Sequence, residues 1–142
     1  MKWVTRERAR VDRIACPWLI RRFIDPDAEL LWVPADRVAA VAAEVGGTPY
    51  DIPGAEYGHH GAECSFDAFM HRHGLDGDAA LVRLARIVRS ADTSAKGLAP
   101  ESAGLEALAA GFHAMDLPDE RSLELQTPLY DALYIYCGGA PR

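Results

Sequence analysis

Residues 2–33, KWVTRERARVDRIACPWLIRRFIDPDAELLWV, decide the fold. The segment opens with a short strand-like run, KWVT, and closes with a β-rich run, ELLWV, that lies between Pro26 and Pro34. Between the two, CPWLIRRFI has helical character, with Pro17 expected at the first helical position, where its missing N–H costs nothing. A strand, a helix and a second strand in this order predict a right-handed crossover between two parallel strands.

The same alternation continues and then stops. Residues 35–45, ADRVAAVAAEV, predict an alanine-rich helix ended by Gly46 and Gly47, and TPYDI at 48–52 predicts a third short strand. From residue 65 onward apolar residues recur at spacings of three and four, which indicates helices; the expected helices cover residues 66–74, 78–92, 100–115 and, after an acidic turn, 127–137. The predicted fold is therefore α+β: a small three-stranded N-terminal βαβαβ unit, mostly parallel, packed against a helical C-terminal half.

Bulk properties narrow the class of protein. The 142 residues suffice for one core but not for two, so residues 1–142 are expected to form a single domain. A formal net charge of −6 disfavours direct nucleic-acid binding, which needs a basic surface. No long apolar run and no signal-peptide pattern occur, so we expect a cytoplasmic protein without a membrane partner. Three cysteines, an odd number, argue against a disulfide framework.

The loop at residues 58–67, GHHGAECSFD, concentrates side chains that bind metals. His59, His60, Cys64 and Asp67 offer the imidazole, thiolate and carboxylate ligands that zinc and iron prefer, and the glycines allow a tight turn. The loop contains no CxxC or HExxH pattern, so it is a weak metal signature by itself. Histidines that only form hydrogen bonds in a loop are the alternative.

Asp92 stands out in the helix expected at residues 78–92. Steps of 100° per residue place it in the middle of the apolar face that Leu81, Leu84, Ala85 and Val88 form. A partly buried carboxylate in the last turn of a helix needs a cation, a metal or several hydrogen-bond donors. Arg89, on the flank of that face, is the structural candidate for its partner, and a bound metal is the functional candidate.

Cys16 is expected just before the helix that Pro17 begins, where free N–H groups favour a thiolate and attract anions. Arg13, Arg21 and Arg22 lie close to it in sequence. A reactive cysteine or an oxyanion site is one interpretation, and a small core residue among solvated arginines is the other. Near the C-terminus, Asp131 is expected to reach an arginine of the N-terminal unit.

Several segments together resemble the C-terminal domain of the ChrB chromate resistance family: residues 2–29, GHHGAECSFDAF (58–69), RIVRSADT (86–93), APESAGL (99–105) and LYDALY (129–134). The resemblance covers nearly the whole chain and implies a role in chromate resistance, with a small anion such as chromate as a partner. Longer family members carry an additional N-terminal region associated with chromate-responsive regulation of a transporter. We therefore expect a stand-alone version of the domain that does not contact nucleic acid.

Our leading hypothesis is a cytoplasmic chromate-resistance domain that binds a metal ion or an oxyanion as a sensor or binding module. The expected metal is a divalent transition metal, zinc or iron, held by His60, Cys64 and Asp92 with His59 and Asp67 beside them. The expected oxyanion-binding residues are Arg13, Arg21, Arg22 and Arg89. Two alternatives remain: a metal- or thiol-dependent enzyme that reduces chromate, using Cys16 or Cys64, and a non-catalytic interaction domain of a transporter or regulator. Alanine-rich helix surfaces are compatible with a homodimer.

Overall fold

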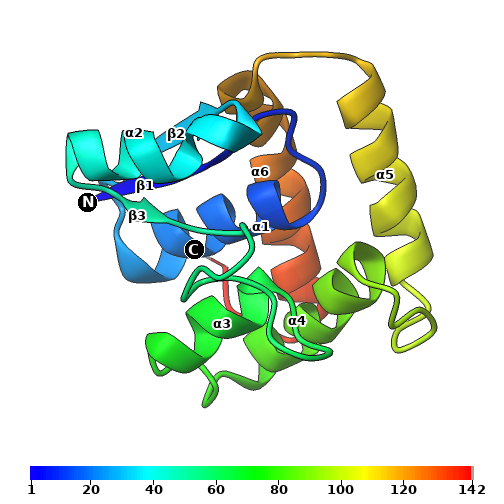
Figure 1. Cartoon of the computed structure of the whole chain (residues 1–142). Helices are drawn as coiled ribbons and strands as arrows, with labels where there is room; N and C mark the ends of the chain where they lie inside the picture. The colour runs from blue at the N-terminus through cyan, green and yellow to red at the C-terminus, as the bar shows by residue number, and fades with distance from the viewer. Residues whose placement is uncertain (142) are drawn as a thin grey trace.

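A parallel sheet and the helices around it make up the molecule, as a computed structural model describes for residues 1–141 (Figure 1). The central strand is β1 (Lys2–Arg6), which pairs in parallel with β2 (Glu29–Val33) on one side and with β3 (Thr48–Pro49) on the other. This arrangement confirms the predicted α+β fold with a three-stranded N-terminal unit. Tyr50 extends β3 by an isolated bridge to Tyr57.

The two faces of the sheet carry different helices. Successive side chains of β1 point to opposite faces, so Val4 packs with Val38 and Ala42 of α2 (Val38–Val45), whereas Trp3 joins the main core. Figure 1 shows α2 above the sheet and α1 (Asp12–Leu19) below it. A 3-10 turn, η2 (Ala35–Arg37), leads into α2, and Gly46 ends this helix with a φ of +68°, a left-handed conformation that glycine adopts without strain.

Helix α1 begins five residues earlier than the sequence predicts, at Asp12 instead of Pro17. Pro17 lies inside the helix, where its missing N–H leaves the carbonyl of Arg13 without a helical donor. The indole Nε1–H of Trp32, on β2, donates to that carbonyl at 3.2 Å. The expectation that Cys16 lies at a helix N-terminus is therefore wrong, because a contact from β2 lets the helix run through the proline. A π-helical turn, η1 (Ile20–Ile24), continues α1.

The C-terminal half is helical, as predicted, and consists of α3 (Ser65–Arg72), α4 (Ala79–Asp92), α5 (Ser102–Ala114) and α6 (Asp119–Tyr136). The acidic segment that was expected to be a turn is the first part of α6. Asp119 and Glu120 lie in its first turn, where their charges suit the helix dipole. None of the helices within residues 1–141 is long and apolar enough to cross a lipid bilayer.

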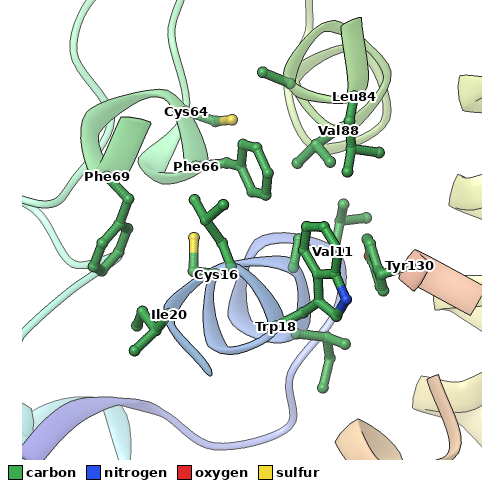
Figure 2. Packing of buried hydrophobic residues seen from close by; sticks show 14 of the residues in the cluster. Val11, Cys16, Trp18, Ile20, Cys64, Phe66, Phe69, Leu84, Val88 and Tyr130 are labelled. Atoms are coloured by element: carbon green, nitrogen blue, oxygen red, sulfur yellow. The ribbon is translucent and has the colours of Figure 1, made fainter. Parts of the chain in front are cut away.

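Helix α1 is the centre of the main core. Figure 2 shows Phe66 from α3, Leu84 and Val88 from α4, and Tyr130 from α6 converging on it. The sulfur atoms of Cys16 and Cys64 lie in the same apolar region, and both residues are fully buried (Figure 2). Three helices from the C-terminal half thus pack against α1.

Leu84 tests the importance of this contact. Leu84→Ala is expected to lower the free energy of unfolding by about 2–5 kcal/mol, because the side chain is fully buried and its removal leaves a cavity. Val82→Ala is the matched control on the same helix, since Val82 is 40% exposed, and we expect a change below about 0.5 kcal/mol. Chemical denaturation measures both, and equal losses would contradict the packing described above.

Candidate metal centre

Four side chains from different elements meet beside the carboxyl ends of β1 and β3. Asp12 begins α1, Asp51 follows β3, His59 lies in the loop before α3, and Asp92 ends α4. The Nε2 atom of His59 lies 3.4 Å from Asp12 Oδ2, 3.1 Å from Asp51 Oδ1 and 3.2 Å from Asp92 Oδ2. One imidazole nitrogen is therefore surrounded by three carboxylates.

Asp12 is held by the start of another helix. Its buried carboxylate accepts hydrogen bonds from the backbone N–H groups of Ser65, at 2.8 Å, and Phe66, at 3.3 Å, which are the first two residues of α3. Helix N-termini carry free N–H groups and the positive end of the helix dipole, so this is a favourable place for a carboxylate. The backbone N–H of Asp12 in turn donates to Asp92 Oδ1 at 3.3 Å. These contacts fix the relative positions of α1, α3 and the end of α4.

Asp51 differs from the other two carboxylates because arginines neutralise it. Its Oδ2 accepts a hydrogen bond from Arg13 Nη1 at 3.3 Å and lies 3.6 Å from Arg6 Nη2, and its Oδ1 accepts one from the Ser65 hydroxyl at 3.0 Å. Asp51 adopts a φ of +53°, which is uncommon outside glycine and is tolerated by aspartate. In the described part of the chain, no lysine or arginine forms a salt bridge with Asp12 or Asp92.

These surroundings change the pKa values of the cluster. Burial, with a contribution from the charge of Asp92, raises the pKa of Asp12 to about 7, although the hydrogen bond from His59 opposes the change. Hydrogen bonds to Asp12, Asp51 and Asp92 raise the pKa of His59 to about 12. Burial opposes ionisation of Asp51, but His59, Arg13 and the Ser65 hydroxyl together lower its pKa. The position of His59 Nε2 therefore strongly favours positive charge.

Asp12, His59 and Asp92 also fit a metal ion. Each offers one ligand atom, all of these atoms lie within 4.8 Å of one another, and no other group of three or more such residues occurs within residues 1–141. Two carboxylates and one imidazole suit zinc or iron(II). A set of three protein ligands leaves coordination positions open for water or another ligand.

The residues expected from the loop divide into two groups. His59 and Asp92 belong to the cluster, whereas His60 is exposed and its Nε2 lies 3.0 Å from the carbonyl oxygen of Glu56. Asp67 accepts the backbone N–H of Cys64 at 3.0 Å and lies 3.4 Å from the Cys64 thiol. His60, Cys64 and Asp67 therefore stand outside the group that Asp92 joins.

Asp92 is partly buried, with 15% of its side chain exposed, which confirms the prediction from its helical face. Arg89, the expected partner, instead lies 3.5 Å from both Glu63 and Asp67. The cationic partner of Asp92 is instead His59, whose Nε2 lies 3.2 Å from Asp92 Oδ2. His59 lies in the loop before α3, so the helical spacing of α4 does not predict this contact.

Sequence reasoning missed Asp12 and Asp51. A signal for Asp12 exists: once the helix begins at residue 12, Asp12, Ala15, Cys16 and Leu19 share one face, so Asp12 is a carboxylate on an apolar stripe, as Asp92 is. The signal for Asp51 is positional, because it directly follows a strand at the carboxyl edge of a parallel sheet, where ligands bind in open α/β folds.

The two candidate thiols are unsuited to ionisation. Burial raises the pKa of both Cys16 and Cys64 well above the usual range, and nearby carboxylates add to the effect. Cys16 lies 3.6 Å from Asp12 Oδ1, so it contacts the cluster as a neutral thiol. Neither environment resembles the electropositive, accessible surroundings of a nucleophilic cysteine.

The candidate oxyanion-binding arginines do not converge on one point. Arg13 contacts Asp51, Arg21 lies 3.1 Å from Glu120, and Arg89 contacts Glu63 and Asp67. Arg22 binds Asp131 through two hydrogen bonds of 3.0 and 2.8 Å, which confirms the prediction that Asp131 reaches an arginine of the N-terminal unit. Arg21 and Arg22 line one cavity together with Glu120 and Asp131, and each of the four arginines is paired with a carboxylate.

The fold and the site define an α+β domain with a histidine and acidic cluster at the carboxyl edge of its parallel sheet. Residues 3–137 match the family model described as ChrB, C-terminal domain, and the chain belongs to this family. It is 36% identical over 135 residues to Protein ChrB of Cupriavidus metallidurans, covering 95% of this chain and 40% of that relative. The chain thus spans less than half the length of this relative, and no solved structure matches it.

Gly58 positions His59. A Cβ at residue 58 would lie 2.9 Å from the carbonyl oxygen of Ala55 and 3.1 Å from that of Ile52, and both atoms belong to the backbone. Gly58→Ala is therefore expected to shift the loop and move His59 away from the carboxylates, which lowers the pKa of its imidazole. Gly77→Ala is the matched control, since a Cβ there meets open space. NMR of the imidazole nitrogens measures the effect, and an unchanged His59 signal in Gly58→Ala would contradict it.

The cluster also predicts a pH dependence in the metal-free protein. Because the pKa of His59 is raised from 6.5 to about 12, folded His59 keeps a proton that the unfolded chain releases above pH 6.5. The free energy of unfolding is therefore expected to fall as the pH rises from 6.5 toward 9, contrary to the trend for a carboxylate of lowered pKa. Denaturation in the presence of a chelator measures the trend. NMR at pH 7.5 should show that His59 is protonated and that His73 is neutral, because burial lowers the pKa of His73.

Proposed function

We propose that this chain is a cation-binding module that acts in chromate resistance, with a divalent transition metal, zinc or iron(II), held by Asp12, His59 and Asp92. The observation that carries the proposal is the convergence of three carboxylates within 3.4 Å of His59 Nε2, while only one of them, Asp51, is paired with arginines. The family to which the chain belongs supplies the setting of chromate resistance.

Charge balance supports a cation at this place. With both carboxylates ionised, Asp12 and Asp92 carry two negative charges, and a protonated His59 compensates one of them. A divalent cation bound to neutral His59 compensates both. Since an uncompensated charge in a buried site is costly, the metal-bound cluster is the better balanced state. Cation binding must displace the proton of His59, so the affinity should rise with pH.

The cluster is accessible enough for a sensor or exchangeable site. The His59 side chain is 42% exposed, whereas Asp12 is buried and fixed by α3. A rigid carboxylate on one side and a solvent-facing imidazole on the other allow the ion to enter without unfolding the core. This combination supports the role of a sensor or binding module, which the cation would switch by replacing the proton on His59.

Direct capture of chromate by Arg13, Arg21, Arg22 and Arg89 has less support, because each of these arginines is already paired with a carboxylate. The thiol version of a chromate reductase also has less support, since Cys16 and Cys64 are buried and resist ionisation. A metal-dependent enzyme is the second candidate, because three protein ligands leave coordination positions open for a substrate. We place the protein in the cytoplasm, where its three free thiols stay reduced.

Metal titration of the untagged protein tests the proposal. We expect one zinc ion per chain by calorimetry and elemental analysis. Asp92→Asn and His59→Gln should each weaken zinc binding by roughly 100-fold, because each removes one of three protein ligands. His60→Gln is the matched control in the same loop and should bind zinc as the wild type does. Circular dichroism verifies that the variants are folded.

Two results would contradict this assignment. Absence of zinc and iron(II) binding in the wild type would remove the metal site. Loss of binding in His60→Gln and Cys64→Ser, with full binding in His59→Gln, would move the site to the residues that the loop sequence suggested.

A further inference from the structure

We propose that the cavity next to this cluster binds a small oxyanion, with one oxygen atom on the bound cation and another on the guanidinium of Arg6. The inference rests on the proposed cation site and adds a ligand and a residue to it. It assigns a role to Arg6, which sequence reasoning did not single out.

The cavity lies directly beside the cation position. Its volume is about 280 Å³, and it is lined by Arg6, Asp51, Ile52, Pro53 and His59. Because Asp51 and His59 belong to both the cavity and the cluster, a ligand in the cavity reaches the open coordination positions of the cation.

The topology of the sheet explains why a cavity forms here. The helix after β1 lies on one face of the sheet and the helix after β2 lies on the other (Figure 1), so the chain turns in opposite directions on the two sides of β1. In open α/β sheets, ligands bind in the crevice that this reversal leaves outside the carboxyl ends of the strands. Arg6 is the last residue of β1, and Asp51 follows β3, so both stand at that crevice.

Arg6 has hydrogen-bonding capacity to spare. Its nearest carboxylate oxygen, Asp51 Oδ2, is 3.6 Å away, which is too far for a hydrogen bond, and Arg13 Nη1 already lies 3.3 Å from the same oxygen. The Nε atom of Arg6 is buried and has no hydrogen-bond partner in residues 1–141. A guanidinium presents a planar set of donors that matches two oxygens of an oxyanion.

The charges make anion binding depend on the cation. Asp12, Asp51 and Asp92 carry three negative charges, and Arg6 and Arg13 carry two positive charges. These five groups sum to −1, and a divalent cation at the site changes the sum to +1, which favours an anion. An oxyanion, unlike a halide, has two oxygens with which to bridge the cation and Arg6.

Calorimetric titration of sulfate into the zinc-loaded full chain, at constant chloride, tests the inference. We expect sulfate to bind the zinc-loaded protein and not the metal-free protein. Arg6→Gln should weaken sulfate binding by at least about 10-fold while leaving zinc affinity within about threefold, because Arg6 is not a zinc ligand. Arg37→Gln is the matched control, since Arg37 is exposed and pairs with Glu44 on a different part of the surface. A parallel titration with acetate shows whether the site prefers tetrahedral oxyanions or carboxylates as ligands.

Arg6→Lys guards against a simple folding defect, since it keeps the charge but loses the planar fork, and it should bind sulfate with intermediate affinity. Zinc binding without any sulfate or acetate binding would overturn the inference and leave the cation site standing. Unchanged sulfate affinity in Arg6→Gln would overturn it as well. Failure of zinc binding in the wild type would instead remove the proposed function, and sulfate binding to the metal-free protein would contradict the bridging arrangement.

Discussion

The carboxylate of Asp12 is the contact on which the rest of the site depends. Asp12 is the first residue of α1. Its carboxylate accepts hydrogen bonds from the backbone N–H groups of the first two residues of α3 and lies 3.4 Å from His59 Nε2. A buried carboxylate is stable only where donors or cations replace the water that it has lost. The positions of α1 and α3 are therefore coupled to the chemistry of the cluster, and the apolar packing around Phe66 and Leu84 keeps both helices in place.

Local patterns were sufficient for most of the fold. The parallel sheet and the helical second half followed from short-range periodicity, and Asp92 was identified because α4 is long enough for helical phase to be reliable. Asp12 was missed because Pro17 was interpreted as the start of its helix. The helix passes through the proline since Trp32 donates to the carbonyl of Arg13, a contact between residues 19 positions apart that no local rule contains.

The choice between His59 and His60 shows a second limit of sequence reasoning. The two histidines are neighbours in a glycine-rich loop, so composition and spacing describe them equally well. The backbone course decides which one faces the carboxylates, and that course depends on the close approach of Gly58 to the carbonyl groups of Ala55 and Ile52. Cys64 illustrates the opposite case, because a side chain with the chemistry of a ligand serves here as part of the apolar core.

The distance along the chain between Asp12 and Asp92 has a consequence for the unfolded state. Their direct contact joins residues 80 positions apart. Asp12 follows β1 in the chain, whereas His59 follows β3. An ion bound to all three would act as a removable cross-link that closes a loop of more than half the chain, and closing such a loop restricts the unfolded ensemble. Occupancy by the ion would therefore govern how often the two halves of the molecule separate, so cellular metal supply could set the lifetime of the protein.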